Sequence, residues 1–215
     1  MGVGRLLCRG LCRMRVTETF VSLQGEGERQ GMPCFFLRLS GCNLRCAWCD
    51  TEYSFEKGTD RSVDELVKEI ADSGLSYVCV TGGEPLLQKE ELIPLLEILA
   101  AADIHVDIET NGTIPFDDVS AYASICMDVK CPSSGEMSDL SLLSALTEND
   151  CVKFVIGDEA DYLYMVEVLA AHKPKAPVCI TPVFGTDTKW LVETIIAERL
   201  PVRFQLQLHK VVNVQ

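Results

Sequence analysis

The sequence lacks long apolar runs and an excess of basic residues. A membrane-spanning helix needs roughly 18 to 20 consecutive apolar residues, and no stretch of the chain approaches that length. The 32 aspartates and glutamates outnumber the 19 lysines and arginines, so the formal net charge is −13. Because an acidic surface repels phosphate backbones and no local basic patch is evident, we expect no direct binding of nucleic acid. A cytoplasmic protein without a membrane partner is expected.

The sequence also lacks the marks of a second domain. No linker, repeat or low-complexity segment divides the 215 residues, so residues 16–215 are expected to form a single domain. Residues 1–15 carry four arginines among short, interrupted apolar runs, which is unlike a signal peptide. We expect this segment to be a disordered extension, or to follow from a misassigned start with Met14 as the true initiator.

Cysteine is abundant, but its pattern argues against a disulfide scaffold. The 11 cysteines are odd in number and spread along a chain that can bury a core without cross-links. A reduced, intracellular protein that uses some of its thiols chemically fits this distribution better.

Short apolar runs alternate with amphipathic stretches, which is the pattern of a parallel α/β sheet. Strands are expected at Val16–Ser22, Cys34–Ser40, Tyr77–Thr81, Val106–Glu109, Ile125–Val129, Val152–Ile156, Val178–Thr181 and Val202–Leu208. Helices are expected at Ser62–Ser73, Lys89–Ala102, Asp161–His172 and Thr188–Arg199, with a shorter one at Asp139–Leu146. This order predicts an α/β fold, a partial TIM-like barrel of parallel strands with helices outside. Reactive groups in such folds lie at the carboxyl ends of the strands.

Three cysteines share one short loop directly after the second expected strand. Cys42, Cys46 and Cys49 fall within eight positions, and thiolates at this density bind zinc or iron–sulfur clusters. A structural zinc site needs four ligands, usually as two separated pairs, and no matching pair occurs downstream. Cysteines that merely pack do not usually share a Gly-rich loop with Asn, Arg and Asp. Three thiolates would leave one metal position open, which a catalytic cluster uses.

The C-x-x-x-C-x-x-C spacing, with Trp48 two residues after the middle cysteine, resembles the cluster loop of the radical S-adenosylmethionine (SAM) superfamily. The resemblance implies a [4Fe–4S] cluster whose open iron binds SAM and whose electron releases a 5′-deoxyadenosyl radical. Thr81–Pro85 resembles the GGEP motif that receives the methionine amino group, and Glu109–Thr113 resembles the ETNG segment near the cofactor. Each of these two segments would, alone, be an ordinary turn.

Residues upstream of the cysteines indicate which family within the superfamily the sequence resembles. Leu23–Gly27 reads Leu-Gln-Gly-Glu-Gly, and Arg38 lies in the strand that leads to the cysteine loop. The arginine is either the ion-pair partner of a core carboxylate or a bidentate clamp on a substrate carboxylate. Together with Cys49-Asp50-Thr51 and Gln207–Lys210, these features resemble the 7-carboxy-7-deazaguanine synthase family from about Glu18 to Lys210.

The resemblance implies conversion of 6-carboxy-5,6,7,8-tetrahydropterin to 7-carboxy-7-deazaguanine with loss of ammonia, on the route to the queuosine or archaeosine modification of tRNA. It also implies magnesium, a homodimer, and an electron donor such as flavodoxin or ferredoxin. The implied substrate-binding residues are Leu23, Gln24, Gly25, Glu26, Arg38 and Thr81. The implied cofactor-binding residues are Trp48, Cys49, Asp50, Gly83, Glu84, Asn111, Lys130, Cys131 and Pro132. Cys42, Cys46 and Cys49 would hold the cluster, and Thr51 would offer its hydroxyl to Mg²⁺.

Some alternatives stay open at this stage. The residues after Lys210 match no motif, and His209 could bind a ligand or be a satisfied strand-end histidine. A glycyl-radical-enzyme activase shares the cysteine loop and a small barrel, but a protein substrate has no need of a carboxylate clamp. A non-catalytic zinc or cluster module would not need the Gly-Gly turn.

Overall fold

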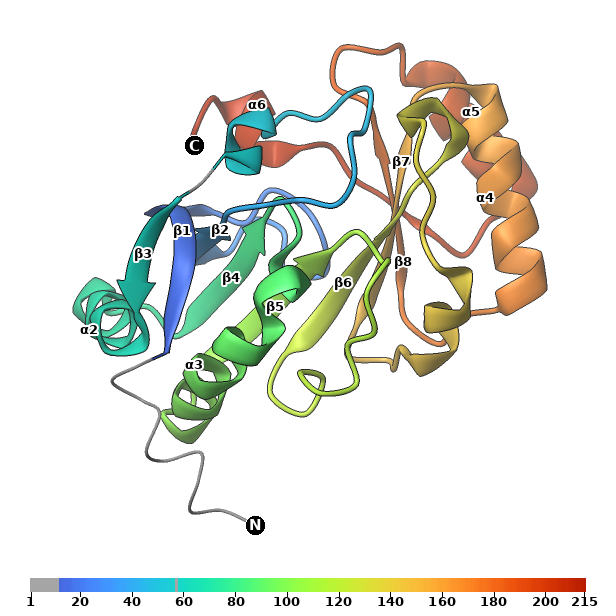
Figure 1. The fold of residues 1–215 in the computed structure, drawn as a ribbon. Helices are drawn as coiled ribbons and strands as arrows, with labels where there is room; N and C mark the ends of the chain where they lie inside the picture. The colour runs from blue at the N-terminus through green and yellow to red at the C-terminus, as the bar shows by residue number, and fades with distance from the viewer. Residues whose placement is uncertain (1–11, 57) are drawn as a thin grey trace.

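The computed structural model describes residues 12–56 and 58–215, and Figure 1 shows their arrangement. In this part of the chain nine strands form one sheet, in the order β3-β1-β2-β4-β5-β6-β7-β8-β9. The two end strands, β3 and β9, do not pair with each other, so the sheet is an open barrel and the predicted partial barrel is confirmed. The strands are β1 (Arg13–Leu23), β2 (Pro33–Leu39), β3 (Thr59–Ser62), β4 (Tyr77–Gly82), β5 (His105–Thr110), β6 (Ser124–Val129), β7 (Cys151–Ile156), β8 (Val178–Pro182) and β9 (Arg203–Phe204).

Strand direction is parallel from β2 through β9, but β1 runs antiparallel to both of its neighbours, β2 and β3. An all-parallel barrel was therefore the wrong prediction at this edge. The physical reason is the connection, because only residues 24–32 join β1 to β2. Parallel neighbours need a crossover of about a dozen residues or more, usually through a helix, whereas antiparallel neighbours accept a short loop.

The first strand begins earlier than the sequence pattern indicated. Arg13 pairs with Ser62 and Arg15 with Asp60 across β1 and β3, while Met14 between them is fully buried. An extension that reaches residue 15 is thus wrong for residues 13–15, and residues 1–11 lie outside the described part of the chain. The polar sequence of β3, Thr-Asp-Arg-Ser, carries no apolar alternation, which is why this edge strand was not predicted.

Most of the helices pack against the outer face of the sheet, and the last one lies near the carboxyl ends of the strands (Figure 1). The helices are α2 (Val63–Ser73), α3 (Lys89–Ala101), α4 (Glu159–His172), α5 (Lys189–Glu198) and the short α6 (Leu208–Val212). The 3-10 helices are η1 (Glu52–Phe55), η2 (Pro85–Gln88), η3 (Pro132–Ser134) and η4 (Leu140–Ala145), the last standing where a helix at Asp139–Leu146 was predicted. In the described residues no helix combines the length and apolarity needed to cross a membrane.

Period-2 alternation along the parallel strands separates the two faces. In β7, Val152, Phe154 and Ile156 pack into the apolar core beneath the helices, while Lys153 and Val155 line the pocket. The same alternation holds in β5 and β6, so polar side chains collect on the inner face. This alternation gives an open barrel its reactive interior.

Local signals place the helix ends as expected. Ser62 and Glu65 form the predicted capping box, with the Ser62 N–H donating to the Glu65 carboxylate at 2.7 Å. Gly74 ends α2 in the left-handed region at φ 69°. The predicted strand Val202–Leu208 is shorter, because the chain leaves β8 after Gln205 and turns into α6 at Leu208.

Candidate active site

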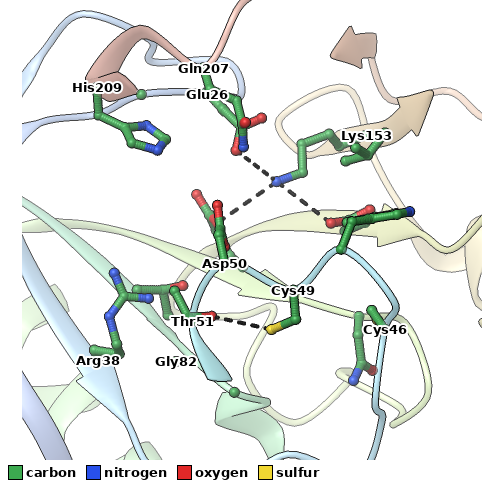
Figure 2. Close-up of a pocket in the computed structure, with 18 of the residues that line it drawn as sticks. Glu26, Arg38, Cys46, Cys49, Asp50, Thr51, Gly82, Lys153, Gln207 and His209 are labelled. Carbon is green, nitrogen blue, oxygen red and sulfur yellow. Dashed lines mark hydrogen bonds and ion pairs between the residues drawn. The ribbon is translucent and has the colours of Figure 1, made fainter. Parts of the chain in front are cut away.

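The three cysteines lie on the loop that follows β2, at the carboxyl end of the sheet, and Figure 2 shows two of them. The loop is held from the far side of the barrel, since the N–H of Ala47 donates to the Ser134 carbonyl at 2.8 Å. Cys42, Cys46 and Cys49 are each half-buried and line the same pocket. One loop thus presents three thiols to one cavity.

The surroundings of Cys42 and Cys46 favour the protonated form of their thiols. Burial raises the pKa of Cys42 and Cys46, and the nearby ammonium of Lys130 opposes the rise. Metal binding must therefore displace protons from the thiols. Among the described residues, no group of three His, Cys, Asp or Glu side chains is arranged closely enough to hold a single metal ion. Three thiols facing one cavity fit a cluster that takes three cysteine ligands and keeps one iron open.

The Gly-Gly turn at the end of β4 touches the cysteine loop directly. A Cβ at Gly83 would lie 2.2 Å from the carbonyl oxygen of Gly41 and 2.7 Å from the Cβ of Cys42. The sequence suggested that these glycines admit a ligand, but the close neighbour in the structure is the loop itself. Glycine at position 83 is thus required for the turn to pack against the cysteine loop.

Glu84 does not line the pocket, although the sequence placed it among the cofactor contacts. Its carboxylate is fully buried and accepts bonds from the Leu86 N–H at 2.9 Å, the Asn111 N–H at 2.7 Å and the Thr110 hydroxyl at 3.0 Å. Burial raises its pKa, and these donors oppose the rise. Glu84 therefore fixes the main chain of Asn111, which lines the pocket and donates from Nδ2 to the Asn43 side chain at 3.0 Å.

The segment after β6 divides between pocket and core. Lys130 lines the pocket, with Nζ 2.9 Å from Asp128 Oδ2 and 5.3 Å from the centroid of the Trp48 ring. Cys131 is fully buried in the apolar core, and Pro132 opens η3 outside the pocket. Of the three residues predicted here for cofactor contact, the structure brings only Lys130 to the cavity.

Residues 24–31, between β1 and β2, close the open side of the barrel against residues 203–208. The side chain of Gln205 makes two bonds to Gly27, accepting from its N–H at 2.9 Å and donating to its carbonyl at 2.7 Å. The Leu208 N–H donates to the Gly25 carbonyl at 3.0 Å. We call this junction the seam. It places Leu23, Gln24, Gly25 and Glu26 in the pocket wall.

Glycine at position 25 is dictated by the seam. A Cβ there would lie 1.9 Å from Nδ1 of His209, whose ring is half-buried in the pocket. Burial lowers the pKa of His209, which favours the neutral imidazole. His209 belongs to α6 rather than to a strand end, so it stands as a pocket residue whose role the sequence left open.

Arg38 forms an ion pair and also lines the pocket, although its carboxylate partner is partly exposed and does not belong to the core. Its Nε donates to Glu18 at 2.8 Å, and its guanidinium lies between the rings of Phe20 and Tyr53, 5.8 and 5.9 Å from their centroids. The residue also lines the pocket beside Thr81, its register partner on β4. Because the bond to Glu18 uses Nε, the two terminal nitrogens of this pocket-lining residue remain as further donors.

Asp50 and Thr51 continue the cysteine loop into the pocket. The Thr51 hydroxyl lies 3.8 Å from Cys49 Sγ, and Asp50 pairs with Lys210 at 2.5 Å. Burial opposes ionisation of Asp50, but Lys210 outweighs it and lowers the pKa of that carboxyl. The loop is thereby tied to the C-terminal segment as well as to β2.

Sequence reasoning missed Lys153 on the inner face of β7, and it gave Glu109 and Asp128 no role of their own beyond membership of segments that resemble cofactor-contact motifs. Glu109, Asp128 and Lys153 line the pocket, together with the rings of Phe20 and Phe36 on the opposite side. The signal for Lys153 was present in the sequence, since a lysine inside the apolar run Val152–Ile156 requires a partner if that strand is buried. The partners lie on other strands, so only the fold identifies them.

The resulting pocket has a volume of about 470 Å³ and is bounded by the cysteine loop, the strand ends and the seam. Fold and site together define a radical SAM enzyme, and residues 37–129 match the model of the Radical SAM superfamily. The chain is 50% identical over 200 residues to the 7-carboxy-7-deazaguanine synthase of Methanospirillum hungatei JF-1, covering 93% of this chain and 86% of the relative. It is 42% identical over 218 residues to that of Koribacter versatilis, covering 92% and 96%. This chain belongs to the 7-carboxy-7-deazaguanine synthase family.

A solved structure agrees with the family assignment. The crystal structure of QueE from Escherichia coli matches with a TM-score of 0.80 and 27% identity, covering 97% of this chain and 100% of that one. The relatives do not favour the alternative of a glycyl-radical-enzyme activase.

Proposed function

We propose that this enzyme converts 6-carboxy-5,6,7,8-tetrahydropterin to 7-carboxy-7-deazaguanine with loss of ammonia. Family membership supports the reaction, and one observation from the structure carries it. The three thiols suited to the cluster and the side chains suited to the pterin line a single cavity of about 470 Å³. Hydrogen abstraction requires the substrate and the cleaved SAM to share such an enclosure.

The residues divide the work between cofactor and substrate. Cys42, Cys46 and Cys49 would hold the [4Fe–4S] cluster, which with SAM supplies the one-electron cleavage that begins the reaction. Gly83, Asn111 and Lys130 line the cavity near the thiols, where they are suited to contact SAM. Glu84 fixes the main chain of Asn111, and Asp128 pairs with the ammonium of Lys130, as described above.

The substrate side matches a pterin that carries a carboxylate. The terminal nitrogens of Arg38 provide the two-pronged donor that a carboxylate prefers. Gln24 is buried, donating at 3.2 Å to the Tyr77 hydroxyl and at 3.3 Å to Glu109. Its side-chain oxygen and the carboxylate of Glu26 are acceptors for the N–H groups on the pyrimidine edge of the ring. The walls formed by Phe20 and Phe36 are flat and apolar, as an aromatic-like ring requires.

Four further features of the family complete the proposal. Mg²⁺ would bind the Thr51 hydroxyl and the substrate carboxylate, since this hard cation seeks oxygen ligands and keeps several waters. The enzyme would act as a homodimer in the cytoplasm and receive electrons from flavodoxin or ferredoxin. Its product would enter queuosine or archaeosine synthesis without direct contact between this acidic chain and tRNA.

The test is anaerobic turnover of 6-carboxy-5,6,7,8-tetrahydropterin after reconstitution with iron and sulfide. Mass spectrometry should find 7-carboxy-7-deazaguanine, and an ammonia assay should find one equivalent per product. Formation of 5′-deoxyadenosine without deazaguanine would show a radical SAM enzyme with another substrate. An activase would instead leave a protein radical on a partner, visible by electron paramagnetic resonance.

A further inference from the structure

Lys153 is a buried cation that the reaction as proposed does not yet use. It projects from the middle of β7 into the pocket, and 6% of its side chain is exposed. Three carboxylates from three different elements surround its ammonium, as Figure 2 shows by dashed lines. Nζ lies 3.3 Å from Glu26 Oε2, 3.7 Å from Asp128 Oδ2 and 3.9 Å from Glu109 Oε2.

A lysine in this position is charged. Burial alone would lower its pKa, but Glu26, Asp128 and Glu109 together outweigh burial and raise it well above the ordinary value. The strand itself does not need the cation, since its apolar neighbours Val152 and Phe154 already pack into the core on the other face. A buried ammonium costs free energy unless it is paired. We therefore look for the role of Lys153 in the three carboxylates that it contacts.

Two of those carboxylates keep an oxygen without a partner. Among the described residues, Glu26 Oε1 and Asp128 Oδ1 are buried and accept no hydrogen bond. Buried polar atoms are nearly always satisfied, so an orphaned oxygen on the wall of a cavity marks where a ligand donor belongs. Glu26 is the better candidate for the substrate, because Asp128 is also bonded to Lys130 at 2.9 Å, on the thiol side of the pocket.

We propose that Lys153 is a positioning residue that pairs with Oε2 of Glu26 and orients the carboxylate, so that Oε1 accepts an N–H from the pyrimidine edge of the pterin. The proposal rests on the proposed function, which supplies the pterin. The backbone of Glu26 is fixed on both sides, by Leu208 at Gly25 and by Gln205 at Gly27. Its carboxylate would then have one orientation, and a ring that offers an acceptor at this edge would be rejected.

Other charged groups face this cluster and set its response to pH. They are Arg38 from β2, Asp50 from the cysteine loop, Cys79 from β4, Cys126 from β6, Lys130 directly after β6, and His209 and Lys210 from α6. Burial raises the pKa of Glu109, and Lys153 opposes that rise. With Lys153 present, the carboxylates and the ammonium compensate each other, and pterin binding should change little between about pH 6 and 9.

Replacing Lys153 by Met should make binding depend on pH. Three carboxyl groups would then surround an apolar side chain, and close like charges cannot all ionise in a buried site. The cluster would take up a proton at neutral pH, turning an acceptor into a donor that opposes the ring N–H. As the pH rises, the carboxyl group loses this proton and can again accept the ring N–H. The loss of pterin affinity in Lys153→Met should therefore become smaller with increasing pH.

The experiment measures anaerobic equilibrium binding of 6-carboxy-5,6,7,8-tetrahydropterin to the reconstituted, SAM-loaded enzyme, together with kcat and KM, across this pH range. Lys153→Met should weaken binding roughly ten- to a hundredfold at the acidic end and less at the alkaline end. Lys153→Arg keeps the charge and should recover much of the affinity. Lys189→Met, which removes a lysine with 78% of its side chain exposed, is the matched control and should behave as wild type.

Cofactor chemistry supplies the remaining readout. Slow cleavage of SAM without pterin should be equal in wild type and all variants, because Lys153 does not act on the cluster. The proposal is overturned if Lys153→Met binds pterin as wild type does, or is weakened equally at every pH. It is also overturned if both Lys153→Met and Lys153→Gln fail to fold or to bind iron, which would make the lysine structural. A wild type that binds SAM and cleaves it but does not convert the pterin would overturn the proposed function and this inference with it.

Discussion

The two walls of the pocket are built in opposite ways. The thiol wall comes from residues 41–51, one continuous and half-exposed loop between β2 and η1. The facing wall is assembled from single side chains on separate elements, with Glu26 from the seam, Glu109 from β5, Asp128 from β6 and Lys153 from β7. The reactive side chains of the first wall lie close together in the sequence. Those of the second wall come together only when the strands pair in the folded sheet. We therefore expect that mutations can separate cluster binding from substrate recognition.

The largest effect should come from the thiol wall. Replacing Cys42, Cys46 or Cys49 by Ala should abolish both the cluster and turnover, because each supplies one of three ligands to a core of about four irons. Cys179→Ala, in the buried thiol group of β6 to β8, should keep its iron. Iron and sulfide analysis of reconstituted protein checks both results, and activity retained in any of the first three variants would contradict the assignment.

Arg38→Lys, in the strand that leads to the thiol wall, should weaken substrate binding without emptying the cluster. Lysine keeps the charge but loses the two-pronged geometry, and loss of a charge-assisted bond costs on the order of 1.5–3 kcal/mol. Pterin affinity should fall roughly ten- to a hundredfold, with iron content unchanged. Arg61→Lys, which alters a pair with Glu69 away from the pocket, is the control. Equal affinity in wild type and Arg38→Lys would reduce Arg38 to the ion-pair partner of Glu18.

Thr51 lies where the two walls meet, so its removal tests how far they are separable. Thr51→Ala should lower product formation on the order of tenfold and blunt its stimulation by Mg²⁺. Reductive cleavage of SAM should persist, since the cluster thiols are untouched. Titration of Mg²⁺, with deazaguanine and 5′-deoxyadenosine measured separately, distinguishes the two activities. An identical Mg²⁺ response in both proteins would place the metal elsewhere.

The smallest effect is expected at the seam. Gln205→Glu keeps the size of the side chain but loses the N–H that donates to the Gly27 carbonyl at 2.7 Å. One neutral hydrogen bond contributes about 1 kcal/mol, so KM for the pterin should rise roughly three- to tenfold. Steady-state kinetics with wild type in parallel measures this change. A lower kcat at unchanged KM would mean that the seam does not position the substrate loop.

What the sequence could predict follows the same division. The cysteine loop, the Gly-Gly turn and the helix ends depend on neighbours within a few residues, and the structure places them where the patterns indicated. The capping box of Ser62 and Glu65 is the plainest case. Local geometry requires particular residue types at fixed spacings, so a sequence pattern can predict it without knowledge of the fold.

The remaining features depend on pairings between distant residues. Glu26 and Lys153 are separated by 127 positions, and no local pattern records that they meet. The polar strand β3 has no apolar alternation to reveal it. Glu84 resembled a cofactor contact, yet its carboxylate bonds to the main chain behind the pocket wall. The GGEP motif thus placed Glu84 next to the pocket, but it did not predict which atoms its carboxylate would contact.

The seam also determines when the enzyme can become active during synthesis. Gly27 and Gln205 are 178 positions apart, and β9 is the last strand of the sheet. A ribosome releases the chain from its N-terminus, so the cysteine loop and β2 to β7 emerge well before residues 203–208. Until those residues emerge, residues 24–31 lack the partners with which they form the seam. The pocket is therefore completed only after the cysteine loop has left the ribosome.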